Sequence, residues 1–335
     1  MNFDDLFNGG LDSKMSFLNE KQGGKANSKE NDGIYRIDMA LASKETGWRS
    51  VLRFLPNVSQ DGQLGECAIE KISHYVDIKE PRELSGYFDS PKNFGKDKKC
   101  YLSDLYYQLD KSNNALLKEK AKSLKYSKKY YSYVMIMEDP RPELVGKIML
   151  FQFGKTIYDK IKIEENGEVS GEKCNIYSLD NGKDFVLMVK EIKTGNITYP
   201  DYKQSTFKGV PTSLPVYSKE NNVFKHIPLV NGKVDPKYHG KIKQILLDRT
   251  VNVEDFAPKP LTEDQQAKIS EITNFLLGKS SQGFVSTPKT TSSASSEDFD
   301  FDNDFDSTPG NAVAESISAP VTQDSEEDDF FSDLD

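Results

Sequence analysis

The 335-residue sequence has no apolar run near the 18 or more residues that a membrane-spanning helix needs. Residues 1–7 carry two aspartates and no basic cluster, so they lack the basic start and apolar stretch of a secretory signal. The three cysteines, Cys67, Cys100 and Cys174, are few, odd in number and far apart, which argues against a disulfide framework. We therefore expect a soluble, intracellular protein with no membrane partner.

Signatures of catalysis and of metal binding are also scarce. The sequence has no Gly-rich phosphate-binding loop and no Cys-x-x-Cys pair. Neighbouring carboxylates such as Glu164 and Glu165 point apart on a strand, so they are poor joint ligands for a nuclease with two metal ions. His74 and Cys100 are the only soft ligands in one region and are weak candidates, because a structural zinc site needs four. We expect a protein that is not an enzyme and that holds no metal or cofactor.

The net charge of −9 conceals a division of charge along the chain. Residues 290–335 contain 14 acidic and no basic side chains, so the first 289 residues carry a net charge of +5. Low apolar content predicts that residues 279–335 form a disordered acidic tail. The polar, Gly-rich residues 1–33 predict a flexible arm with a short helix over 13–20. Residues 34–278 are then the folded core.

Short apolar segments separated by polar connections predict a mainly β fold with added helices. The runs 51–56, 134–137, 147–153 and 185–192 predict strands, and the composition of 112–124 favours a helix. A later helix begins at a capping box, Thr262 to Gln265, and ends at Gly278. Several short strands with long irregular connections are typical of a small barrel. We expect an OB-fold-type barrel core with elaborated loops.

Lysine and aromatic residues are concentrated in residues 92–162, which hold 16 basic, 8 acidic and 11 aromatic side chains. The densest stretch, 125–133, has three lysines and four tyrosines. Single-stranded nucleic acid offers phosphates to cations and open base faces to rings. On a strand, Tyr131 and Tyr133 share a face and Tyr130 lies opposite, so we expect half of these rings to line a groove. The alternative is that the tyrosines are core residues and the lysines their solvated neighbours.

The acidic tail contains phenylalanines at 299, 301 and 305 that a purely solubilising tail does not need. An acidic strip with apolar anchors is typical of a peptide that docks on a basic, apolar pocket of another protein. Because the tail and the core have opposite charges, we expect the tail to compete for the groove and to recruit partners. The alternative is a solubilising appendage. The predicted partner-binding residues are Asp328, Asp329, Phe330, Phe331 and Leu334.

The ordered set of core segments resembles the T4-type bacteriophage single-stranded DNA-binding, or helix-destabilising, protein family. The similarity covers roughly residues 15–210, with a tail matched by composition. It implies an OB-fold core, cooperative and sequence-independent binding of single strands, and tail contacts with replication and recombination proteins. The segments that carry the resemblance are 51–56, 130–140, 146–161, 184–190 and 195–199.

By matching position, the resemblance implies a DNA-binding groove of basic and aromatic side chains. Two features depart from the family. Its type member has a zinc subdomain of one histidine and three cysteines, of which only His74 and Cys100 can be matched here, so we expect packing to replace the metal. The family starts with a basic segment that docks on the neighbouring protomer, whereas residues 2–7 are acidic and apolar, so self-association along DNA would need another contact. The implied groove residues are Arg53, Lys128, Lys129, Tyr130, Tyr131, Phe151, Lys155 and Tyr199, with Phe88 and Tyr107 from a loosely matched stretch.

We therefore expect a sequence-independent single-stranded DNA-binding protein of phage DNA replication, recombination and repair, in the cytoplasm of the infected host cell. Two alternatives stay open. One is a replication scaffold that recruits proteins without direct DNA binding. The other is a nuclease or another enzyme acting on DNA, for which the sequence offers no credible site.

Overall fold

A computed structural model describes residues 33–42, 46–78, 84–168, 171–194 and 197–278. These ranges contain six α-helices and thirteen strands, so the prediction of a mainly β fold with added helices is confirmed. The predicted helix at 13–20 and the acidic tail lie outside the described residues. Among the described helices, none has the length and apolar character needed to cross a membrane.

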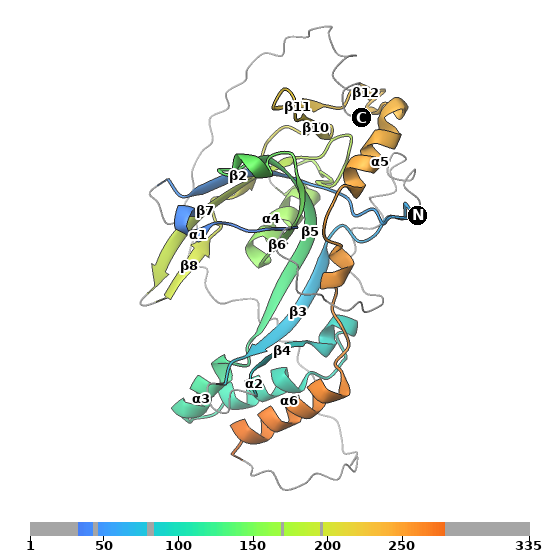
Figure 1. Cartoon of the computed structure of the whole chain (residues 1–335). Coiled ribbons are helices and arrows are strands. Elements are labelled where there is room, and N and C mark those ends of the chain that lie inside the picture. The colour runs from blue at the N-terminus through green and yellow to red at the C-terminus, as the bar shows by residue number, and fades with distance from the viewer. Residues whose placement is uncertain (1–32, 43–45, 79–83, 169–170, 195–196, 279–335) are drawn as a thin grey trace. The chain divides into compact units, whose positions relative to one another are not determined.

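Nine strands form one sheet, whose main order is β1-β6-β5-β2-β7-β8 (Figure 1). The predicted strands are all present, as parts of β2, β5, β6 and β7. The strands on the main path are β1 (Ile34–Tyr35), β2 (Trp48–Phe54), β5 (Tyr126–Glu138), β6 (Ile148–Phe153), β7 (Asp184–Thr194) and β8 (Ile197–Asp201). Off this path, β3 (Ile69–Val76) pairs with β5 and with β4 (Gly86–Asp89), and β9 (Thr206–Phe207) pairs with β7.

The strands that the structure describes do not close into a ring. At one end of the path, β1 contributes only two residues to a parallel pair with β6. At the other end, β8 pairs antiparallel with the second half of β7, beyond the residues that pair with β2. The two ends do not pair with each other among the described residues, so the OB-fold-type barrel is not confirmed.

The main core is built around Phe54 of β2. Its ring centroid lies 5.8–6.5 Å from five other aromatic rings. Edge-on and tilted contacts at this separation are the favourable arrangements of aromatic pairs. These rings come from β6, β7, β9 and the connection before β7, so one cluster ties distant parts of the chain together: Phe151, Phe153, Tyr177, Phe185 and Phe207.

Along the sequence, the first four α-helices lie between strands, and α5 and α6 follow the last strand. The predicted helix at 112–124 is present as α3, and the predicted capping box is formed at α6, where Thr262 and Gln265 bond each other's backbone N–H. Gly278, with φ of +67°, follows that helix, as glycine commonly does at a helix end. The α-helices are α1 (Met39–Ala42), α2 (Tyr101–Asp110), α3 (Ala115–Lys122), α4 (Lys155–Asn166), α5 (His239–Leu247) and α6 (Glu263–Leu276). Short 3₁₀ helices are η3 (Pro91–Phe94), η4 (Pro142–Leu144), η5 (Pro236–Tyr238) and η6 (Val253–Phe256), and two small hairpins pair β10 (Pro215–Ser218) with β11 (Val223–His226) and β12 (Leu229–Val230) with β13 (Lys233–Val234).

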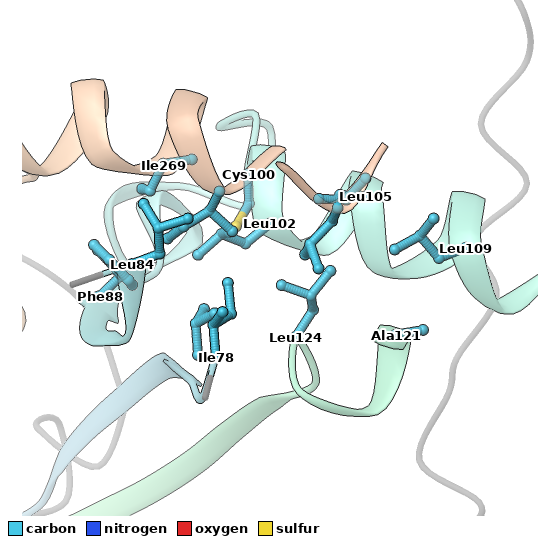
Figure 2. Close-up of a cluster of buried hydrophobic side chains, with 13 residues drawn as sticks. Ile78, Leu84, Phe88, Cys100, Leu102, Leu105, Leu109, Ala121, Leu124 and Ile269 are labelled. Atoms are coloured by element: carbon cyan, nitrogen blue, oxygen red, sulfur yellow. The ribbon is translucent and has the colours of Figure 1, made fainter. Parts of the chain in front are cut away.

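A second hydrophobic cluster joins the β3–β4 hairpin to α2, α3 and α6. Figure 2 shows side chains from these elements pointing toward one another, with Leu84, Phe88 and Ile269 on one side and Leu109 and Ala121 on the other. Because α6 follows β4 by more than 170 residues, a late segment completes a cluster begun early in the chain. Its members are Val76, Ile78, Leu84, Phe88, Cys100, Leu102, Leu105, Leu109, Ala121, Leu124, Ile269, Ile272 and Leu276.

Residues 249–256 cover one face of β5. The hydroxyl of Tyr133 donates to Val251 O at 3.0 Å and accepts from Val253 N at 2.7 Å. The guanidinium of Arg249 lies 4.2 Å from the centroid of the Tyr133 ring, within the range of a cation–π contact. This late segment, to which the sequence alone assigns no role, therefore buries a tyrosine of the lysine–tyrosine stretch.

Candidate nucleic-acid interface

The lysine–tyrosine stretch forms the first half of β5, where that strand pairs antiparallel with β3. In this register Tyr126 lies opposite His74, Lys128 opposite Ile72 and Lys129 opposite Lys71. Side chains alternate between the two faces of a strand, so Lys128 and Lys129 point to opposite faces. We call these the Lys128 face and the Lys129 face.

On the Lys128 face, Tyr130 is buried against α4. Its ring is parallel to that of Tyr158, with 4.1 Å between centroids, and stacks on Phe153 at 5.7 Å. Burial, followed by the nearby charge of Glu70, raises the pKa of Tyr158 to about 12. The same two causes raise the pKa of Tyr130, so both phenols of the stacked pair lose their protons at a more alkaline pH than an exposed tyrosine does.

The partly exposed Lys128 lies beside these rings. Its ammonium group is 3.5 Å from a carboxylate oxygen of Glu70, and the two side chains are 34% and 28% exposed. Glu70 also contributes to the raised pKa of both Tyr130 and Tyr158, which places its carboxylate next to the stacked pair. The Lys128 face thus presents a cation and an acid next to an aromatic stack.

Two further tyrosines continue this face toward α2. Tyr126 is half-buried, with its ring 6.3 Å from that of His74. Burial, followed by the proximity of Tyr126, raises the pKa of Tyr107 on α2. Tyr107 also makes an edge contact with Tyr106, at 5.2 Å between centroids. The Lys128 face therefore carries a run of partly exposed rings from Tyr107 through Tyr126 to Tyr158.

Additional cations border this run on α4. The ammonium group of Lys162 lies 5.7 Å from the centroid of the Tyr158 ring. Lys155, at the first turn of the same helix, is exposed and lies 3.4 Å from Asp159. Lysines next to partly exposed aromatic rings are the combination of side chains that binds single-stranded nucleic acid.

Five of the ten predicted groove residues are buried: Arg53, Phe88, Tyr130, Tyr131 and Phe151. Phe151 belongs to the main core and Phe88 to the second cluster, while Tyr131 packs on Phe256 at 5.2 Å. The alternation of tyrosines on β5 is as predicted, but burial of Tyr130, Tyr131 and Tyr133 covers the rings on both faces. In this structure these side chains contribute packing rather than exposed contacts.

Arg53 shows why a basic residue is not always a ligand contact. The side chain has no exposed area, and its guanidinium donates to Gly182 O at 2.8 Å and Thr212 O at 2.6 Å. It also pairs with Asp184 at 3.3 Å. Burial lowers the pKa of Arg53, and Asp184 opposes that effect. This cation therefore joins β2 to the segments around residues 182 and 212.

The other five predicted residues reach the surface in different places. Lys128, Lys155 and Tyr107 border the Lys128 face, whereas Lys129 lies on the opposite face of β5. Tyr199 is exposed on β8, which is separated from β5 by β2 and β7 in the sheet order. The structure therefore brings three of the ten predicted residues to the surface of the Lys128 face, and a fourth, Tyr130, is buried on the same face.

Sequence reasoning missed Tyr126 and Tyr158. A signal for each was present, because Tyr126 precedes Lys128 by the two-residue period of a strand. Tyr158 follows Lys155 by three residues, which places both on one side of a helix. Neither signal could be used without the strand and helix boundaries.

The weak metal-ligand candidates, His74 and Cys100, are buried at the edge of the second cluster. The Nδ1 atom of His74 donates to Leu124 O at 2.7 Å, and Nε2 lies 3.3 Å from Cys100 Sγ and 3.4 Å from Ser103 Oγ. Burial alone would raise the pKa of Cys100, but hydrogen bonds with His74 and neighbouring serines lower it to about 6. Within the described ranges, no group of three or more His, Cys, Asp or Glu side chains is placed to hold a metal ion.

Comparison with known proteins agrees with the composition of this surface. A family described as "gp32 DNA binding protein like" matches residues 47–274. The chain is 27% identical over 203 residues to the single-stranded DNA-binding protein of Enterobacteria phage T4, covering 59% of this chain and 60% of that protein. It is 26% identical over 203 residues to the single-stranded DNA-binding protein of Enterobacteria phage T2, covering 59% of this chain and 61% of the relative. The matched region thus spans about three fifths of these relatives, and the resemblance seen in the sequence is confirmed.

Proposed function

The chain belongs to the gp32-like DNA-binding protein family, and we propose that it binds single-stranded DNA without sequence preference and without catalysis. The observation that carries the proposal is the Lys128 face, where partly exposed tyrosines from α2, β5 and α4 lie beside lysines. The relatives are named as single-stranded DNA-binding proteins, which supports the same ligand.

The proposed binding combines two kinds of contact. Lys128, Lys155 and Lys162 neutralise phosphates, which releases counterions and gives salt-dependent affinity. Tyr107, Tyr126 and Tyr158 stack on bases, at about 1–3 kcal/mol per base, and a ring accepts any base. A phenol is uncharged near pH 7 and does not repel phosphate, and the raised pKa of Tyr107 and Tyr158 keeps those two protonated to a higher pH.

Glu70 limits the affinity of this face. Its carboxylate pairs with Lys128 and therefore competes with any phosphate for the same ammonium group. Because both side chains are partly exposed, the pair is weak enough for a phosphate to displace. We propose that Lys128 exchanges Glu70 for a phosphate when DNA binds.

The wider role is proposed from charge and composition. The acidic tail, residues 279–335, lies outside the described residues. The charge of residues 290–335 is opposite to that of the first 289 residues, which supports competition with DNA and recruitment of replication and recombination proteins. We propose that the protein acts in phage DNA replication, recombination and repair in the cytoplasm of the infected host. Self-association along DNA is part of the same proposal.

Titration of the full chain with poly(dT), followed by intrinsic fluorescence at several salt concentrations, tests the proposal. We expect quenching and a steep loss of affinity with salt, because phosphate contacts dominate. An absence of binding at low salt would favour the scaffold that recruits proteins without DNA. Metal-dependent shortening of the strand during the titration would favour a nuclease.

A further inference from the structure

The Lys129 face carries a pair of exposed tyrosines on β3 and β4. Tyr75 lies directly opposite Tyr87 in the antiparallel register of the two strands. Their side chains are 61% and 44% exposed. Directly opposed side chains on one face of a sheet lie about 4.5–5.5 Å apart at Cβ, so Tyr75 and Tyr87 project side by side from this face, and we call the pair its aromatic surface.

Tyr87 is held across the sheet rather than left to rotate. Its hydroxyl donates to Ser73 Oγ. The ammonium group of Lys71 lies 5.7 Å from the centroid of the ring and 3.1 Å from Asp89. A ring fixed at its hydroxyl and bordered by a cation loses little conformational entropy when a flat ligand stacks on it.

The aromatic surface continues from β4 across β3 to β5. Burial, followed by the proximity of Tyr87 and Asp89, raises the pKa of Tyr131, which lies opposite Ile69 of β3. Lys129 lies opposite Lys71 on this same face. Two lysines therefore border rings that run from the exposed pair toward the buried Tyr131.

The geometry points to Tyr75 and Tyr87 as a second base-stacking site for single-stranded DNA, on the opposite face of β5 from the Lys128 face. This inference rests on the proposed function, because it assigns a further contact to the same strand. The chemistry favours a nucleic acid over an apolar protein segment. Lys129 supplies a phosphate contact, while the Lys71–Asp89 ion pair next to the rings would be costly to bury under an apolar partner.

The test compares a Tyr75→Leu/Tyr87→Leu variant with a Tyr101→Leu control in the full chain. Leucine keeps apolar bulk on the strands but cannot stack on a base. Tyr101 is a matched control because its side chain is 62% exposed and has Lys99 Nζ 4.9 Å from the ring centroid. It belongs to neither β3 nor β4, and its position at the start of α2 puts it on a different side of that helix from Tyr107. Binding is measured with dT oligonucleotides of about eight and about twenty nucleotides, which lie within and beyond the usual range of site sizes.

We expect the double variant to lose roughly 5- to 100-fold in affinity for the longer oligonucleotide, and the control to bind as the unchanged chain does. Equal affinities of the double variant and the unchanged chain would overturn the inference and leave the proposed function intact. If the unchanged chain binds neither oligonucleotide, the proposed function fails and this inference falls with it. Thermal unfolding shows whether each variant is folded. If the double variant is unfolded, the affinity of the single Tyr75→Leu variant is compared instead, because Tyr75 is mostly exposed and its replacement should not disturb the fold.

Discussion

Because Lys128 pairs with Glu70, we predict that replacing one or the other residue changes DNA affinity in opposite directions. Lys128→Gln removes a phosphate contact, whereas Glu70→Gln removes the acid that competes for that contact. Both keep the length of the side chain nearly unchanged. The pair is partly exposed, so either change should alter the stability of the fold by less than about 1 kcal/mol.

The magnitudes follow from the electrostatics of single strands. Each phosphate contact contributes about 0.7 to the slope of log K against log salt concentration, so Lys128→Gln should flatten the slope by about that amount. A partly exposed ion pair is worth at most about 1 kcal/mol, which corresponds to roughly fivefold in affinity. Glu70→Gln should therefore raise affinity by up to that factor at low salt.

The assay is a poly(dT) titration of each variant at four or more salt concentrations, with Lys219→Gln as the control. Lys219 is an exposed lysine just after β10, so its loss changes the net charge equally. We expect the slope of the control to match that of the unchanged chain. Equal slopes for Lys128→Gln and Lys219→Gln, or weaker binding by Glu70→Gln, would refute the assignment of Lys128 to a phosphate.

Three further predictions concern stability and the tail. Arg53→Met leaves the acceptors around the guanidinium without their donor, so urea unfolding should show a loss of about 3–5 kcal/mol; a loss below 1 kcal/mol would contradict this structural role. Hydrophobic packing stabilises the second cluster, so Ile272→Ala should lower the free energy of unfolding by about 2–5 kcal/mol. EDTA should leave the melting temperature of the unchanged chain as it is, and a fall in that temperature would point to a bound metal. Deletion of residues 290–335 should raise DNA affinity at low salt, because 14 acidic side chains are removed; unchanged affinity would exclude competition by the tail.

Local patterns were enough to predict the main strands. The apolar runs at 51–56 and 147–153 overlap β2 and β6, and the capping box at Thr262 marks the start of α6. The strand β3 was not predicted, because its residues alternate between apolar and polar types less clearly and include Glu70, Lys71 and His74. The packing of α6 into the second cluster could not be predicted, because it depends on contacts between residues far apart in the sequence.

The candidate site was only partly predictable for the same reason. The lysine–tyrosine stretch and its alternation could be read locally, but the burial of Tyr133 depends on residues 249–256, more than a hundred positions later. Arg53 is a cation in a strand, and only the tertiary structure shows that backbone carbonyls surround it. Tyr75 and Tyr87 precede the lysine–tyrosine stretch 125–133 by more than thirty residues and become its neighbours through strand pairing.

Photocrosslinking would show whether single-stranded DNA lies on the Lys128 face. The full chain would be irradiated with dT oligonucleotides that carry 5-iodouracil, and the linked peptides identified by mass spectrometry. Stacked rings react efficiently, so we predict crosslinks at Tyr107, Tyr126 or Tyr158 that high salt suppresses. Crosslinks confined to residues 208–247, or none under conditions where the oligonucleotide binds, would contradict the account.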